Sequence, residues 1–133
     1  QVYNQVGLYS NYFFLYAEQG DYALRARKLG FKLIFTPKAK LWHKVSMTTG
    51  NGNKRALKVL YWRGQGLFVL QYRHLKKRFF IAIVVKNFVY FILRSIIGKH
   101  ENRATSLAML RGYFWGLRWM FNKKPNDGKN PYI

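Results

Sequence analysis

The chain of 133 residues has the size of one ordinary domain, and half of its residues are hydrophobic, which is enough for a core. It carries 24 Lys and Arg against four Asp and Glu, for a formal charge of +20. This charge favours polyanionic partners, namely nucleic acid, anionic lipid or phosphorylated substrates. The absence of cysteine excludes disulfides and thiol chemistry. The abrupt start at Gln1, without a signal-peptide pattern, predicts a piece of a longer protein.

The first third of the chain predicts short, mixed elements. Residues 4–10 read as a helix end followed by a glycine turn, and residues 12–16 form an aromatic run typical of a strand. A helix is expected over residues 21–29, with acid at its start and basic residues at its end. Two short strands are expected next, over residues 31–35 and 39–43.

The remaining two thirds predict helices. Residues 46–53 form a polar Gly/Asn loop, and the tail over residues 122–133 is expected to be disordered. Gly64 and Gly66 are expected to weaken the first of the helices. The three expected helices cover residues 54–71, 79–97 and 103–121.

The two apolar helices suggest contact with a membrane. Residues 79–97 are about long enough to span a bilayer, but the central Lys86 costs about 3 kcal/mol on insertion. Its polar residues share one narrow arc of the helix, and Trp115 and Trp119 on the last helix suit a headgroup region. We therefore expect both helices to lie in the interface of an anionic membrane. A shallow hairpin, or two helices packed into a soluble core, are the alternatives.

Glu18 and Asp21 are two of the four acids, and they lie three residues apart. This spacing places both carboxylates on one side of a helical turn. In so basic a chain, such a pair at the start of a helix indicates chemistry. Asp21 fits equally well as a helix N-cap.

Three blocks of the sequence, residues 13–34, 36–46 and 60–63, carry a resemblance to a known family. Together they resemble the C-terminal part of family 2 glycosyltransferases of the GT-A fold, especially the bacterial rhamnosyltransferase-like group. The resemblance covers about residues 5–75. It implies an α/β fragment in which residues 1–50 end the catalytic domain, residues 51–78 form a connecting loop and basic helix, and residues 79–121 form two amphipathic, membrane-associated helices.

The resemblance also implies a reaction and a set of site residues. The acceptor hydroxyl would lose its proton to a catalytic carboxylate, while Mg²⁺ or Mn²⁺ neutralises the departing nucleotide diphosphate. Glu18 and Asp21 are the implied catalytic residues and His43 the implied metal ligand. The implied substrate-binding residues are Gln19, Arg25, Trp42 and Arg63.

Gln19 departs from the family pattern, because that position usually holds the base and an amide cannot accept the proton. Either Glu18 takes the role, or the protein is weakened or inactive, or the alignment is off by one residue. The chain also lacks an Asp-x-Asp motif and a nucleotide-binding βαβ start, so the chain alone is expected to be inactive.

The implied partners are a nucleotide-sugar donor, a glycan or lipid-linked acceptor of cell-envelope polysaccharide, and an anionic membrane. The expected location is peripheral, on the cytoplasmic face of a bacterial inner membrane. The alternative is a non-catalytic, cationic and aromatic module that binds membrane or nucleic acid. The acid pair would repel a polyanion, and the basic residues interleave with apolar runs, which disfavours nucleic acid.

Replacing His43 with Ala in the complete enzyme is expected to raise the Mn²⁺ concentration needed for half-maximal sugar transfer, because an imidazole ligand is lost. A metal titration of sugar transfer measures this. An unchanged titration would mean that His43 is not a ligand.

Overall fold

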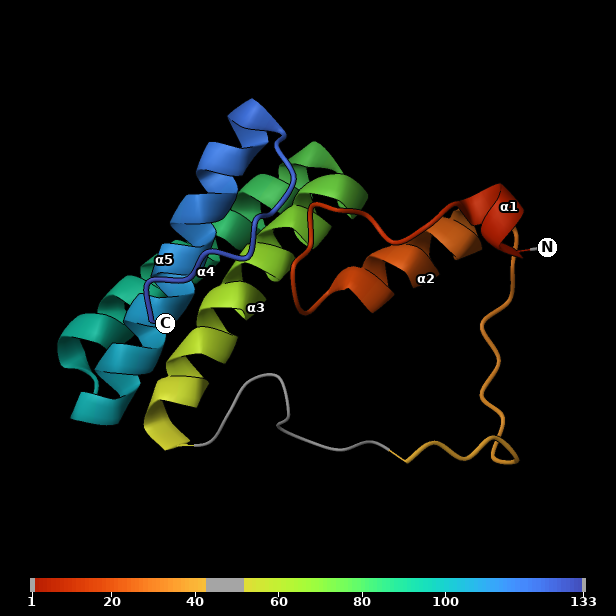
Figure 1. Cartoon of the computed structure of the whole chain (residues 1–133). Helices are drawn as coiled ribbons and strands as arrows, with labels where there is room; N and C mark the ends of the chain where they lie inside the picture. Colours follow the sequence, from red (N-terminus) through yellow and green to blue (C-terminus); the bar gives the residue numbers. More distant parts are fainter. Residues whose placement is uncertain (1, 43–51, 133) are drawn as a thin grey trace.

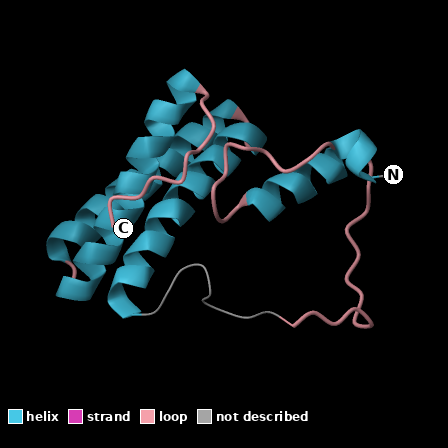
Figure 2. Cartoon of the chain, viewed as in Figure 1, coloured by secondary structure: helices cyan, strands magenta, loops and turns pink. Residues whose placement is uncertain are grey.

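The computed structural model describes residues 2–42 and 52–132, and within these ranges all regular structure is helical. Figure 1 traces the helices along the chain, and Figure 2 shows loops as the only other structure in the described ranges. The five helices are α1 (Val2–Val6), α2 (Glu18–Lys28), α3 (Gly52–His74), α4 (Lys77–Ile97) and α5 (His100–Asn122).

The expected α/β architecture is therefore wrong. Residues 12–16 form turns and bends, and residues 31–35 and 39–42 are irregular, while His43 lies outside the described residues. A strand needs a neighbour to pair its backbone groups, whereas a helix pairs its own. No such neighbour occurs in the described ranges, and Leu33, Ile34 and Phe35 of the expected strand stay exposed, with Phe35 at 88%.

The expected helices are confirmed, and each begins two or three residues earlier than expected. Residues 54–71, 79–97 and 103–121 fall inside α3, α4 and α5 respectively. The helix expected from residue 21 begins three residues earlier, at Glu18, so the acid pair lies in its first turn. Residues 46–51 of the expected polar loop are outside the described residues, and the last two residues of that loop belong to α3.

The three long helices lie side by side and enclose the core (Figure 1). Its centre holds Phe68 of α3, Val84 of α4, and Met109 and Tyr113 of α5. The rings of Phe68 and Tyr113 meet edge to face, with centroids 5.7 Å apart, which is a favourable geometry for aromatic pairs. The apolar spacing of each helix therefore produces a packed bundle.

Glycines set how closely α3 and α5 approach. A Cβ built on Gly112 of α5 would lie 2.9 Å from the Cα of Gly64 and 2.9 Å from the backbone nitrogen of Gln65. Only a hydrogen fits at such a distance. Gly64, which we expected to weaken its helix, is instead a contact point between two helices.

The chain before α2 packs on another side of α3. Phe13, Val69 and Trp119 form a second buried cluster there, so Trp119 lies in the core and not at a headgroup surface. Gly66 allows the backbone of this segment to approach, because a Cβ on Gly66 would meet the carbonyl oxygen of Tyr16 at 2.5 Å. Gly66, like Gly64, is a contact point between segments.

The C-terminal segment, residues 123–132, was expected to be disordered, but it runs back along the bundle (Figure 1). The indole of Trp62 donates to the Gly128 carbonyl oxygen at 3.3 Å, and Asn126 donates to the side chain of Gln65 at 3.0 Å. The backbone nitrogen of Asn126 also donates to the Asn11 carbonyl oxygen at 2.9 Å. The segment thus fastens the start of the chain to the bundle.

Helix α4 leaves most of its apolar surface uncovered. It has 21 residues, and by length and composition alone it is the one helix of the described chain that could cross a membrane. Its polar stripe partly faces α5, since Asn87 donates to the hydroxyl of Tyr113 at 2.7 Å. The exposed apolar residues of α4 are Phe79, Ile81, Val85, Val89, Ile92, Leu93, Ile96 and Ile97.

Substituting Gly112 with Ala is expected to lower the free energy of unfolding by about 1–3 kcal/mol, because the new methyl group forces α3 and α5 apart. Chemical denaturation measures this. The matched control is Gly20→Ala in α2, where a Cβ would make ordinary contact with Leu70 at 3.7 Å. That variant is expected to be neutral or stabilising, because Ala is the better helix former. Equal stability of the two variants would contradict the close packing.

Candidate functional site

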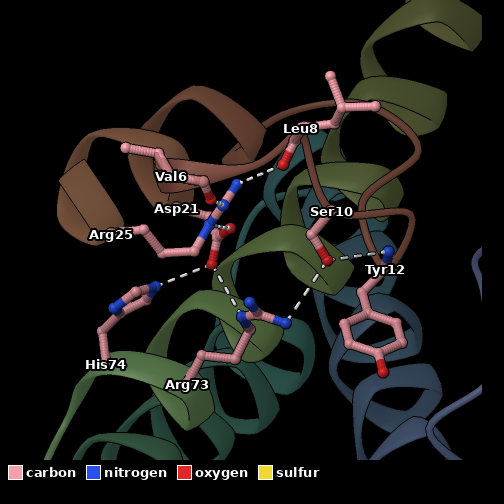
Figure 3. A network of polar contacts seen from close by, with 8 residues as sticks. All are labelled: Val6, Leu8, Ser10, Tyr12, Asp21, Arg25, Arg73 and His74. Atoms are coloured by element: carbon pink, nitrogen blue, oxygen red, sulfur yellow. Dashed lines mark hydrogen bonds and ion pairs between the residues drawn. The ribbon is translucent and has the colours of Figure 1, made fainter. Parts of the chain in front are cut away.

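Asp21 is the centre of a charged cluster where α2 meets the end of α3 (Figure 3). Its side chain is 0% exposed. One carboxylate oxygen accepts from Arg25 at 3.0 Å, and the other accepts from Arg73 at 2.8 Å and lies 2.8 Å from Nε2 of His74. A buried carboxylate is stable only when paired in this way.

The two arginines extend the cluster to the start of the chain. Arg25 donates to the carbonyl oxygens of Val6 and Leu8, the latter at 2.7 Å. Arg73 lies within 3.5 Å of the Ser10 hydroxyl, and its guanidinium stacks over the ring of Tyr12. A single buried carboxylate thereby joins α2, the end of α3 and the segment that leads from α1 to α2.

Burial alone would raise the pKa of Asp21, but its partners reverse this. The hydrogen bond from His74 and the positive charges of Arg73 and Arg25 together hold the pKa of this carboxyl below its usual value. Asp21 is therefore ionised throughout the physiological range. A proton acceptor for catalysis needs a pKa near the working pH, so these surroundings suit Asp21 to positioning its neighbours.

Glu18 begins α2 directly after a strained turn. Tyr16 and Ala17 both have φ of 70°, the left-handed region that residues with a Cβ rarely adopt. Such conformations cost about 1–3 kcal/mol each and persist only where packing enforces them. Here the close approach of this turn to Gly66 enforces them. The turn fixes the backbone position at which α2 begins with Glu18.

Several buried polar atoms around this helix have no hydrogen-bond partner among the described residues. They include Oε2 of Glu18, the hydroxyl of Tyr22 and Nδ1 of His74. Glu18 and Tyr22 are four residues apart and share one face of α2, next to Asp21. Buried polar groups are normally satisfied, so unpartnered polar atoms on one face of α2 indicate a place for a polar ligand.

The structure brings together only part of the predicted site. Glu18, Asp21 and Arg25 lie on α2, and Gln19 between them is exposed. Trp42 is 94% exposed in the irregular segment after α2. Arg63 lines a separate cavity between α3, α4 and α5, about 15 Å along the helix axis from Arg73. His43 lies outside the described residues.

Arg73 and His74 were missed as site residues, because both lie in the segment over residues 51–78 that was expected to be a connecting loop and basic helix. They lie 52 and 53 residues after Asp21, a separation that no local pattern spans. One signal was available: an acid on the apolar side of a helix in a basic chain requires cationic partners. The sequence does not reveal which of the 24 basic residues supply them.

The described residues show little that fits a metal ion. No group of three His, Asp or Glu that could hold one occurs within the ranges 2–42 and 52–132. Both oxygens of Asp21 are already engaged by cationic side chains. Of the implied ligands and catalytic acids in these ranges, this leaves the carboxylate of Glu18, and one carboxylate alone does not make a metal site.

Comparison with known proteins gives no family assignment. A scan against protein-family models and searches of the curated proteins and the solved structures return no match to this chain.

Asp21→Asn is expected to lower the free energy of unfolding by about 3 kcal/mol at neutral pH, because it leaves cationic partners without their counter-charge. Asp21 has a lowered pKa in the folded protein, so its contribution is complete above its ordinary value of 3.8. The contribution is lost as the pH falls through the lower folded value. The difference between wild type and variant should therefore shrink below about pH 4, as urea denaturation at several pH values measures.

Asp127→Asn is the control for this experiment, because Asp127 pairs with Lys129 in an exposed position. Such surface pairs contribute little to stability. A destabilisation by Asp21→Asn no larger than that by Asp127→Asn would contradict the buried cluster.

Proposed function

We propose that this chain supplies the acceptor-side carboxylate of an inverting glycosyltransferase. The enzyme would move a sugar from a nucleotide-diphosphate donor to a hydroxyl of a glycan or lipid-linked acceptor of the cell envelope. The observation that carries the proposal is Glu18, whose buried Oε2 has no partner among the described residues. The resemblance of residues 13–34 to family 2 glycosyltransferases supports the same assignment.

Glu18 is the proton acceptor in this proposal. Its free carboxylate oxygen accepts a hydrogen bond from the acceptor hydroxyl and then takes the proton as the oxygen attacks the anomeric carbon of the sugar. The bond from that carbon to the diphosphate breaks, and the nucleotide diphosphate leaves with the electron pair. The protonated Glu18 later returns its proton to water. Gln19, one residue on, is exposed and can donate or accept a hydrogen bond to the acceptor sugar.

Asp21 has a positioning role in this proposal. It fixes α2 against α3 through Arg73 and His74, and so holds the first turn of α2, where Glu18 lies. Arg25 completes this frame by binding backbone carbonyl oxygens before α2, which leaves it little capacity for substrate. A base held within a fraction of an ångström of its working position is what such a frame provides.

The donor and the metal are assigned to other residues. The 133 residues contain no Asp-x-Asp motif, so the proposal places the nucleotide and its Mg²⁺ or Mn²⁺ largely on protein outside them. His43 stays the proposed metal ligand of this chain. It lies outside the described residues, and no step of the reaction is derived through it.

Membrane association is the second part of the proposal. The uncovered apolar face of α4 and the basic residues Lys76, Lys77 and Arg78 at its start support peripheral binding to an anionic membrane. This fits the cytoplasmic face of a bacterial inner membrane and a lipid-linked acceptor. The same face also favours the alternative, a membrane-binding module without catalysis. The carboxylate of Glu18 distinguishes the two, since membrane binding alone does not use it.

Glu18→Gln in the protein encoded by the full gene is expected to slow sugar transfer by roughly a hundredfold or more, because an amide cannot accept the proton. Donor binding should stay near normal. Initial rates with a radiolabelled sugar nucleotide measure the transfer, and equilibrium dialysis measures the binding.

The matched control is Glu101→Gln, which makes the same change at an exposed acid in the first turn of α5. It is expected to leave transfer unchanged. Full transfer by the Glu18→Gln enzyme would remove Glu18 from the role of base and favour the non-catalytic alternative.

A further inference from the structure

A cavity of about 370 Å³ opens between α3, α4 and α5, away from the Asp21 cluster. Two arginines line it, Arg63 of α3 and Arg94 of α4, together with Thr105 and Ser106 of α5. Apolar side chains, among them Leu67, complete the wall, and no carboxylate takes part. The composition of the wall suits a ligand that carries negative charge.

The two arginines lack acidic partners in the part of the chain that the structure describes. Arg63 is exposed and forms no ion pair with residues 2–42 or 52–132. Arg94 donates to Asn102 at 2.7 Å and to the hydroxyl of Tyr90 at 3.1 Å, both of them neutral acceptors. Two positive charges facing one cavity repel each other, and a bound anion would remove that repulsion through charge-assisted hydrogen bonds.

Ser106 independently indicates a binding site. Its side chain is 2% exposed and lines this cavity, yet its Oγ has no hydrogen-bond partner among the described residues. A hydroxyl buried without a partner is costly, so natural proteins rarely retain one without a reason. An anion held between Arg63 and Arg94 gives the hydroxyl an acceptor.

A second, apolar cavity of about 310 Å³ adjoins the same arginine. Its lining includes Arg94 together with Leu93 and Ile97, which belong to the uncovered apolar face of α4. Arg94 therefore separates a cationic cavity from an apolar groove. An amphiphile with an anionic head and a hydrocarbon chain matches both, whereas a free anion matches only the first.

We propose that the cavity between Arg63, Arg94 and Ser106 binds the phosphate headgroup of a membrane lipid, with a lipid chain lying along α4. Arginine forks suit phosphate oxygens, and the Ser106 hydroxyl donates to a third oxygen. Arg94 lies one turn from the end of α4, which is where headgroups lie for a helix of this length in or on a bilayer. This site rests on the proposed membrane association and is independent of sugar transfer.

The test compares variants of the whole chain in sedimentation with phosphatidylcholine vesicles that contain phosphatidic acid. Arg63→Gln is expected to weaken binding at least tenfold, because it removes a charged hydrogen-bond donor to phosphate. Arg118→Gln removes an exposed arginine from α5 outside the cavity and is expected to change binding by less than twofold. Ser106→Ala is expected to weaken binding without lowering the unfolding temperature, since its hydroxyl has no partner in the fold.

Two outcomes would overturn the proposal. An equal loss for Arg63→Gln and Arg118→Gln would mean that the net charge of the chain, and not the cavity, attracts the lipid. If inorganic phosphate displaces the protein from the vesicles as strongly as added phosphatidic acid does, the cavity binds free phosphate and is not a lipid site. Binding to phosphatidylcholine alone is expected to be weak in every variant, because its zwitterionic headgroup gains little from the arginines.

Discussion

The buried carboxylate of Asp21 is the interaction on which the arrangement of this chain depends. It is the point where α2, the end of α3 and the segment before α2 meet. Its partners lie up to 53 residues from Asp21 in the sequence. Ionised acids are rarely buried, because desolvation is costly, and here two guanidiniums and an imidazole repay that cost. Among the described residues, the hydrogen bonds that join α2 to α3 come from Arg73 and His74, and Asp21 accepts both.

This constraint explains why the two acids of α2 have unequal roles. Asp21 has both oxygens engaged and a lowered pKa, which fixes its charge and suits it to positioning. Glu18 lies one turn earlier, directly after two residues with left-handed backbone conformation. Its buried Oε2 has no partner among the described residues. In the proposed enzyme, Asp21 holds the helix and Glu18 takes the proton.

Local patterns in the sequence predicted the helices well and the strands badly. Apolar spacing over residues 79–97 and 103–121 marks helices whose hydrogen bonds are internal, so the prediction holds whatever surrounds them. A strand over residues 31–35 depends on a neighbour that the described chain does not provide. The composition of the segment does not show whether such a neighbour exists, and Leu33, Ile34 and Phe35 stay exposed.

Contacts between residues that are far apart in the sequence could not be predicted either. Gly64 and Gly66 read as weak points of a helix, because the partners that need their small size, Gly112 and the turn at Tyr16, are distant in sequence. Likewise, the spacing of Glu18 and Asp21 placed them correctly on one helix, while the partners of Asp21 on α3 left no local trace. The candidate site was therefore half predictable: the acids, but not their surroundings.

Chemical rescue tests the proposed division of labour between the two acids most directly. Glu18→Ala and Asp21→Ala are prepared in the complete protein, and sugar transfer is measured with increasing formate. A small carboxylate can replace a missing base but cannot rebuild a buried ion cluster that joins three segments. Formate is expected to restore transfer to Glu18→Ala and not to Asp21→Ala. Rescue of Asp21→Ala alone, or of neither variant, would contradict it.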